Sequence, residues 1–196
     1  MTLTPSPSAS RADATSHWLK RYYFARFAFS AIWVLLALAV ARYVPTLAAV
    51  MLVGYPAWDA IANVVDAQRS GGLARNRAQL LNVVVSVVTA VAVAIALGRG
   101  MNQVLFVFGI WAGFSGILQL AAAVARWKTI GAQWAMILSG AQSTLAAAFM
   151  IRMAGGTAPV GIAAVAPYAA FGAFYFLISA VSLTLGDARK AARTAG

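Results

Sequence analysis

The heptapeptide YPAWDAI at residues 55–61 recurs as WAGFSGI at residues 111–117 and as YAAFGAF at residues 168–174. Each copy begins with an aromatic residue, has a second aromatic residue three positions later, and is otherwise mostly small or apolar. The copies begin 56 and 57 residues apart (111 − 55 = 56 and 168 − 111 = 57). An internal repeat defines architecture, and this unit is long enough for two membrane-crossing helices. The spacing therefore predicts three repeated helical hairpins, packed around a pseudo-threefold axis.

The composition indicates a membrane protein. The 196 residues are 62% hydrophobic and 10% charged, with a mean hydropathy of +0.81. A soluble domain is about half apolar and about one-quarter charged, so the polar groups of this chain are too few to cover its apolar residues in water. We therefore expect an all-α integral membrane protein whose principal partner is the lipid bilayer.

Six apolar segments have about the length of a transmembrane helix. Helix is required because lipid offers no partners for backbone N–H and C=O groups. The expected segments are Phe27–Val44, Thr46–Val65, Leu80–Leu97, Val104–Ala125, Ala132–Ile151 and Pro159–Leu185.

These segments divide the chain into three parts. We expect a disordered polar tail at residues 1–17, a six-helix domain at 18–186, and a basic tail at 187–196. Within the domain, the repeats are expected at about 22–70, 78–127 and 132–186.

The basic residues predict the orientation of the helices. Of the 15 lysines and arginines, 12 fall in the N-terminal region, the second and fourth connections and the C-terminus, and 3 fall in the other connections. Because Lys and Arg are retained on the cytoplasmic side, both termini are expected in the cytoplasm. The 12 residues are Arg11, Lys20, Arg21, Arg26, Arg69, Arg75, Arg77, Arg126, Lys128, Arg189, Lys190 and Arg193, and the other 3 are Arg42, Arg99 and Arg152. This distribution favours membrane orientation and headgroup contact over nucleic-acid binding.

The residue inventory excludes several kinds of chemistry. The chain has no cysteine and a single histidine, His17. A thiol nucleophile, a thiolate metal site and a histidine-based triad are therefore excluded, and we expect no enzyme activity, metal or cofactor. The Gly71-Gly72 pair lacks the following Lys-Ser/Thr of a phosphate-binding loop. A homo-oligomer or a membrane-protein partner remains open.

A candidate buried polar cluster lies toward the cytoplasmic side. Counting from the first predicted turn places Arg26 and Asp59 within a few ångström of the same depth, at about 1.5 Å per residue. Asn63 lies one turn along the Asp59 face. The repeat places Asn82 at the position of Arg26, and Ser115 at that of Asp59. A lone carboxylate at the centre of a membrane helix costs about 2.5–3.5 kcal/mol, so a pair between Arg26 and Asp59 is expected.

The cluster has two interpretations. It is either a buried salt bridge that stabilises the first hairpin or a site that binds and releases a proton. The structural interpretation is favoured, because proton relays usually need several titratable groups. Gly109, Gly113 and Gly116 have a packing interpretation, because small residues at such spacing allow membrane helices to approach closely.

Several stretches resemble a known family. These are WLKRYYFARFAFSAIW at 18–33, YPAWDAIANVVDAQRSGG at 55–72, IWAGFSGILQLAAAVARWKTIG at 110–131 and LSGAQSTLAAAFMI at 138–151. Their pattern of glycine, aromatic and apolar residues is similar to that of the HdeD-like bacterial membrane proteins, which carry the repeat called domain-of-unknown-function 308. The resemblance covers about residues 18–188. It implies a six-helix protein of the bacterial inner membrane with a role in acid-stress resistance, and it assigns no catalytic or binding residue.

Two functions follow as hypotheses. The first is a non-enzymatic multi-pass inner-membrane protein that contributes to acid or envelope stress tolerance. The alternative is a small proton or solute transporter or channel that uses Arg26 and Asp59. Against the alternative, each repeat holds two helices, so the three copies run in the same direction, whereas many transporters contain inverted repeats.

Overall fold

The structure is a computed structural model that describes residues 7–69, 71–126 and 134–195. Over these residues the chain forms six α-helices and three short 3₁₀ turns, with no β-strand, which confirms the prediction of an all-helical chain for this part. The helices are α1 (Pro7–Ala39), α2 (Pro45–Arg69), α3 (Arg77–Leu97), α4 (Met101–Arg126), α5 (Trp134–Ala154) and α6 (Ala166–Ala195). The 3₁₀ turns are η1 (Ala41–Tyr43), η2 (Leu73–Arg75) and η3 (Ile162–Ala164).

Five of these helices are long enough and apolar enough to cross a membrane, which is the pattern of a multi-pass membrane protein. The five segments are His17–Ala39, Pro45–Arg69, Arg77–Leu97, Met101–Leu120 and Ala166–Arg189. The remaining helix, α5, has 21 residues, with Gln142, Ser143 and Thr144 in its middle and Arg152 in its last turn.

The helix ends differ from the predicted boundaries at both ends of the chain. α1 begins at Pro7, within the predicted N-terminal tail, and residues 1–6 lie outside the described residues. Proline is favoured at the first position of a helix, where its missing N–H has no intrahelical role. At the other end α6 continues to Ala195, through most of the predicted basic tail. The predicted boundary between the second and third repeats, at 127–132, also lies outside the described residues.

The chain divides into two compact units, and the single six-helix domain over residues 18–186 stays a prediction. The first unit contains α1 through Ile32 and α6 from Ala169 onward. The second contains Trp33–Tyr168, and therefore the last turns of α1, all of α2 to α5 and the first residues of α6.

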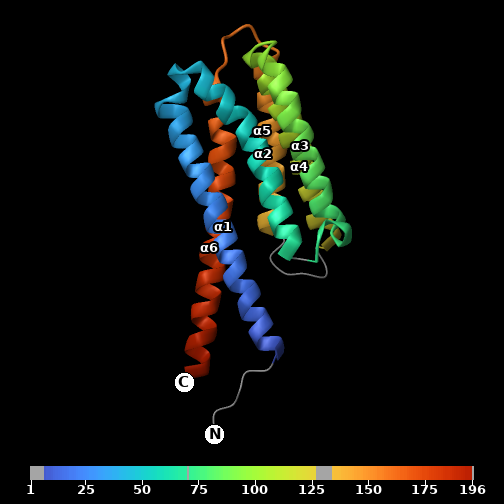
Figure 1. Cartoon of the computed structure of the whole chain (residues 1–196), viewed down its shortest axis with the longest axis vertical. Helices are drawn as coiled ribbons and strands as arrows, with labels where there is room; N and C mark the ends of the chain where they lie inside the picture. The colour runs from blue at the N-terminus through green and yellow to red at the C-terminus, as the bar shows by residue number, and fades with distance from the viewer. Residues whose placement is uncertain (1–6, 70, 127–133, 196) are drawn as a thin grey trace. The chain divides into compact units, whose positions relative to one another are not determined.

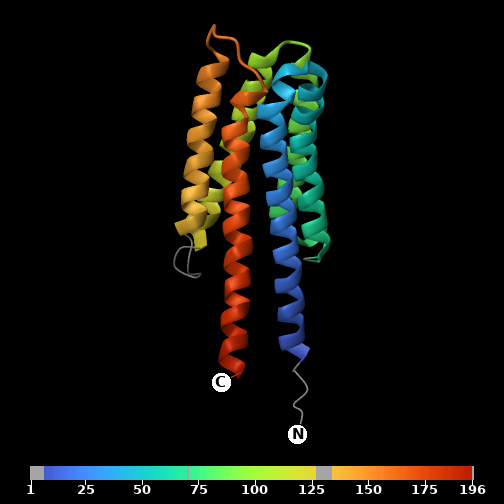
Figure 2. The ribbon, with the colours of Figure 1, turned by 90° about the vertical axis from the view of Figure 1, so that its left-hand side faces the viewer.

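In the first unit, α1 and α6 lie side by side, with the start of α1 and the end of α6 at the same end (Figures 1 and 2). Lys20 Nζ lies 2.7 Å from Asp187 Oδ2 in a partly exposed salt bridge. Farther along, Tyr23 stacks on Phe176 with ring centroids 6.4 Å apart. These contacts fix the register of the pair.

In the second unit, α4 packs most extensively on α5 and α2 on α3, while α3 and α4 make a smaller contact (Figure 1). Both of the extensive pairs follow one rule. The second helix of one predicted repeat packs on the first helix of the next repeat. The most extensive pairings therefore lie between neighbouring predicted hairpins.

Equivalent positions of the three repeat copies have similar environments. Leu52, Phe108 and Val165, which precede the three heptapeptides by three residues, are each completely buried. The residue after the first aromatic is buried in every copy, as Pro56, Ala112 and Ala169. The last residue of each heptapeptide is exposed by more than half, at 57% for Ile61, 58% for Ile117 and 53% for Phe174.

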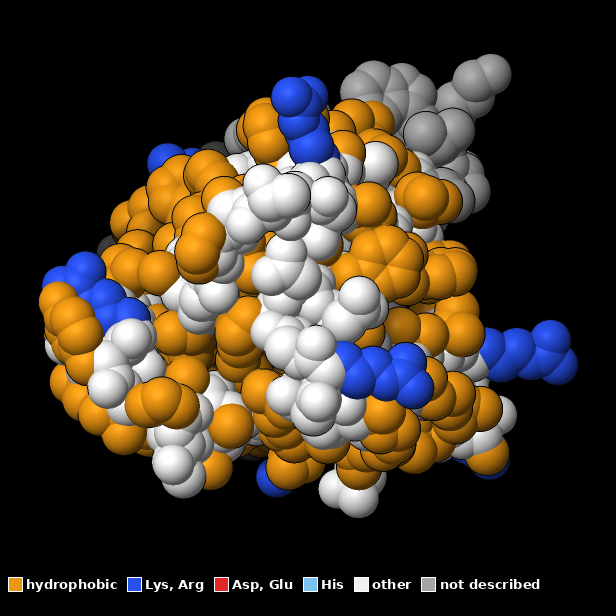
Figure 3. All heavy atoms as spheres, turned by 90° about the horizontal axis from the view of Figure 1, so that it is seen from above, with side chains coloured by type: hydrophobic (Ala, Val, Ile, Leu, Met, Phe, Trp, Pro, Cys, Tyr) orange, Lys and Arg blue, Asp and Glu red, His pale blue; other side chains and the backbone are white. Residues whose placement is uncertain are grey.

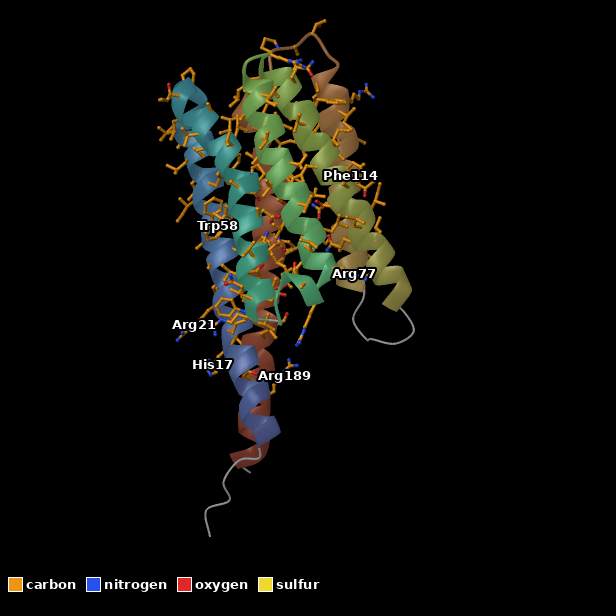
Figure 4. The ribbon with its side chains drawn as sticks, turned by 45° about the vertical axis from the view of Figure 1, so that its right-hand side comes forward. His17, Arg21, Trp58, Arg77, Phe114 and Arg189 are labelled. Carbon is orange, nitrogen blue, oxygen red and sulfur yellow. The ribbon has the colours of Figure 1, made fainter. Side chains whose placement is uncertain are left out.

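The exposed residues of the heptapeptides are suited to lipid. Phe114 on α4 is 59% exposed, and Phe171 on α6 is also exposed. Figure 4 labels Phe114 and Trp58, the second aromatic residues of their copies. Figure 3 looks onto one end of the helices, where hydrophobic side chains also occupy much of the surface among scattered Lys and Arg side chains. An exposed apolar surface of this kind is stable where hydrocarbon surrounds it.

Candidate functional site

The Asp59 carboxylate lies at the interface of α2 and α3. Ser86 of α3 donates a hydrogen bond from Oγ to Asp59 Oδ2 over 2.7 Å. Asn63, one turn along α2, donates from Nδ2 to the same oxygen over 3.0 Å and to the Asp59 carbonyl oxygen over 2.8 Å. Ser86 and Asn63 are buried, and Asp59 is half-buried. Two donors at one carboxylate oxygen lower the cost of placing the carboxylate in an apolar setting.

A second polar pair lies nearer the turn between these helices. Gln79 of α3 donates a hydrogen bond from its side-chain amide to the Asp66 carboxylate of α2. Asp59, Asn63 and Asp66 are spaced by four and three residues, so they share one face of α2. From α3, Ser86 donates to Asp59 and Gln79 donates to Asp66. The result is a polar track from the α2–α3 turn to Asp59, which lies ten residues before the end of α2 at Arg69 (69 − 59 = 10), or about 15 Å along the helix.

The polar track ends beyond Asp59. Thr89, the next buried polar residue of α3, donates to the backbone carbonyl of Val85 over 2.8 Å and so satisfies itself within its own helix. Farther along α3, Val93 is completely buried and Ala96 is nearly so. The Ser86–Asp59 and Gln79–Asp66 hydrogen bonds therefore lie in the half of the α2–α3 interface nearer the turn at residues 71–76.

Arg26 lies in an aromatic environment in the first unit. Its Nη1 donates to the Tyr22 hydroxyl over 2.9 Å. The guanidinium carbon lies 4.3 Å from the ring centroid of Phe176 on α6 and 5.7 Å from that of Tyr22. Cation–π contacts of this kind are stronger where the cation is desolvated. Arg26 therefore takes part in the packing of α1 on α6.

The predicted pair of Arg26 and Asp59 joins residues of different units and stays a prediction. The structure does bring Asp59 and Asn63 together, as the helical spacing indicated. Asn82 is exposed on α3, and Ser115 is half-buried on α4. Asn63 and Ser86 both donate to the Asp59 carboxylate, so Ser86 is an α3 residue at this carboxylate. The pairing of Asn82 with Ser115 as the second-hairpin counterpart stays a prediction.

Ser86 is the site residue that the predicted cluster lacked. A signal for it was present, because the repeat places Ser30, Ser86 and Ser143 at one position of the first helix of each copy. The prediction sought the partners of Asp59 within a predicted hairpin, whereas the carboxylate accepts a hydrogen bond from α3, the first helix of the next predicted repeat.

The predicted packing glycines lie against α5. A Cβ atom on Gly109 would come within 2.8 Å of Ile151 Cγ1, and one on Gly116 within 2.6 Å of Thr144 Oγ1 and 2.7 Å of the Gly140 carbonyl oxygen. Gly113 is less tightly packed, at 3.4 Å from Ala147 Cβ. Gly140 of α5 matches them, since its Cβ would lie 2.9 Å from the Gly116 carbonyl oxygen. Such close backbone approach is what small residues permit in membrane helix pairs.

The chemistry of these polar groups is limited. Among the described residues, no three His, Cys, Asp or Glu side chains are grouped as metal ligands would be. On α4 and α5, Gln119 Oε1 accepts a 3.4 Å hydrogen bond from Ser139, which joins two helices without a charged group. Comparison with protein-family models, with curated proteins and with solved structures found no match.

Proposed function

We propose that this chain is a non-enzymatic six-span protein of the bacterial inner membrane, built as three repeated hairpins, which contributes to acid or envelope stress tolerance. The observation that carries the architecture is the shared environment of equivalent positions, above all the complete burial of Leu52, Phe108 and Val165. Random apolar segments would not repeat one burial pattern at intervals of 56 and 57 residues. The stress role rests on the resemblance to the HdeD-like proteins, and no match to a family model supports it.

The proposed orientation places both termini and the α2–α3 turn in the cytoplasm. It is supported by the 12-to-3 division of basic residues. The same orientation requires α5 as the fifth span, so that six spans bring both termini to one side. The 21 residues of α5 are about as long as the hydrocarbon is thick. Its polar side chains include Ser139, which bonds to α4, and Thr144, which bonds to the α5 backbone.

The experiment is acid survival of a strain that lacks the gene. The strain is complemented with wild type, Arg26→Ala, Asp59→Asn, the double variant and Ser115→Ala as a matched polar control, and membrane levels of each protein are measured. We expect the deletion to lower survival and wild type and Ser115→Ala to restore it. Normal survival of the deletion strain at low pH and under envelope stress would contradict the stress role.

A proton or solute pathway is the second candidate, and the polar track on α2 and α3 favours it. Two of the four acidic residues of the chain, Asp59 and Asp66, lie on one face of α2 and bond to α3. Intramembrane acids of this kind often mark ion pathways. The test is flux in proteoliposomes. Proton or solute uptake by wild type that is lost in Asp59→Asn, with Ser115→Ala unchanged, would establish a pathway; equal flux in protein-free vesicles would remove it.

A further inference from the structure

The turn between α2 and α3 carries a concentration of positive charge. Arg69, Arg75 and Arg77 are all exposed within nine residues. Figure 4 labels Arg77 at the N-terminal end of α3. The nearest acidic residue in the sequence is Asp66, whose carboxylate accepts the hydrogen bond from Gln79. We name Arg69, Arg75 and Arg77 the basic turn.

The backbone of this turn is held by hydrogen bonds. At the end of α2, Gly72 N–H donates to the Ala67 carbonyl oxygen over 2.7 Å, with φ of 97° at Gly71 and 89° at Gly72. These positive φ angles favour glycine, which allows the chain to leave the helix in a compact left-handed turn. The 3₁₀ turn follows, in which Arg75 N–H donates to the Gly72 carbonyl oxygen over 3.2 Å.

The start of α3 is fixed in the same way. Asn76 is its N-cap, and its side-chain oxygen accepts from Gln79 N–H over 3.3 Å. Asn76 N–H itself donates to the Leu73 carbonyl oxygen over 3.2 Å. Arg75 and Arg77 therefore flank a capped residue on a defined backbone. A defined backbone reduces the entropy that two arginines lose when they bind one anion.

The basic turn lies where lipid headgroups are found. α2 and α3 are both long and apolar enough to cross a membrane, and the segments end at Arg69 and begin at Arg77. Directly after Arg77, the side chains of Leu80, Leu81 and Val84 are each more than 40% exposed on α3. Exposed aliphatic side chains fit the acyl region, and arginines one to two turns away fit the phosphate level.

We propose that the basic turn binds the phosphate of an anionic phospholipid, with Arg75 and Arg77 as its principal ligands and the acyl chains beside Leu80, Leu81 and Val84. Guanidinium groups suit phosphate because their N–H groups form paired, charge-assisted hydrogen bonds with its oxygens. Phospholipid is the occupant because the arginines adjoin an exposed aliphatic surface at the end of two spans. A nucleic acid has no acyl chains to cover that surface. The proposal requires these helices in a membrane but neither the stress role nor a transport activity.

The test uses the full-length protein in vesicles of phosphatidylcholine with or without phosphatidylglycerol, and measures the lipid that stays bound by native mass spectrometry. Each basic residue near an anionic membrane surface contributes about 1 kcal/mol, so Arg75→Gln with Arg77→Gln is expected to lower the preference for phosphatidylglycerol about 25-fold. The loss should shrink as salt is raised, because exposed charges are screened.

The matched control is Arg42→Gln with Arg99→Gln, which removes the same charge from exposed positions at the opposite ends of the same two helices. We expect the control to retain most of the wild-type preference. If both double variants lose the same preference for phosphatidylglycerol, the effect is a general electrostatic attraction and the proposed site is overturned. The proposal is also overturned if neither double variant loses any preference. Binding of a single-stranded RNA probe that depends on Arg75 and Arg77, with phosphatidylglycerol binding unchanged, would also overturn it. Unchanged helical circular dichroism verifies that each variant is folded.

Discussion

Trp111 and Tyr168, which open the second and third copies of the heptapeptide, lie edge to face with ring centroids 5.9 Å apart and an interplanar angle of 71°. Tyr55, which opens the first copy, meets Trp111 in the same way at 6.0 Å and 82°. Residues separated by 56 and 57 positions thus form one aromatic cluster in the second unit. The first aromatic residue of each copy therefore has a packing role, since each copy contributes one ring to this cluster.

Replacement of Trp111 is expected to destabilise this cluster. Trp111→Ala removes a buried ring that contacts Tyr55, Phe108 and Tyr168, and a cost of about 3 kcal/mol is expected from the lost packing. Trp111→Phe should cost less, because an edge-to-face ring is retained. The measurement is the unfolding free energy in mixed detergent micelles.

The control for that series is Phe114→Ala, one turn along α4 on an exposed position. Its side chain contacts lipid or detergent, so a change within about 0.5 kcal/mol is expected. A loss at Phe114 as large as that at Trp111 would mean that the cluster is not the centre of stability in this unit.

Any side chain larger than hydrogen at Gly116 is expected to destabilise the α4–α5 contact. Gly116→Ala would place a methyl group 2.6 Å from Thr144 Oγ1 and 2.7 Å from a backbone oxygen, so the helices must separate. Overpacking of this kind costs about 1–3 kcal/mol. Gly54→Ala in α2 is the matched control, because its Cβ would meet no atom within 4 Å. If thermal unfolding shows the two variants to be equally stable, the close approach of α4 and α5 is not present in the membrane.

The hydrogen bond between Ser86 and Asp59 is expected to appear as an energetic coupling. A double-mutant cycle of Ser86→Ala and Asp59→Asn should give about 0.6 kcal/mol, which is typical of side-chain hydrogen bonds between membrane helices. The same cycle with Ser115→Ala in place of Ser86→Ala should give about zero, because Ser115 lies on α4, whereas the hydrogen bond joins α2 and α3. A coupling to Ser115 as strong as that to Ser86 would contradict the α2–α3 location of the site.

The absence of cysteine makes the proposed topology easy to test. The natural chain has none, so Arg75→Cys and Arg99→Cys each introduce a single thiol. With both termini in the cytoplasm, a membrane-impermeant maleimide should label Arg99→Cys in spheroplasts and Arg75→Cys only in inverted vesicles. The reverse pattern would invert the orientation, and labelling of both in spheroplasts would contradict a span at α3.

The sequence alone determined the class of the protein and the positions of most helices. Long apolar segments must be helical in lipid, because backbone groups have no other partners there. This local requirement explains why the predicted segment Leu80–Leu97 ends at the same residue as α3. The one-turn spacing of Asp59 and Asn63 was likewise readable, because contacts four residues apart follow from helix geometry.

The tertiary structure decided which helices meet. Chain order favoured partners within a predicted hairpin, whereas Asp59 of α2 bonds Ser86 of α3, in the next predicted repeat, and Gly116 approaches Gly140 across α4 and α5. Side-chain shape selects such contacts, because helices in lipid gain little from burying apolar surface and associate where small residues and hydrogen-bond partners match. The sequence contains these small and hydrogen-bonding residues, but only the packing of the helices determines which residue each of them contacts.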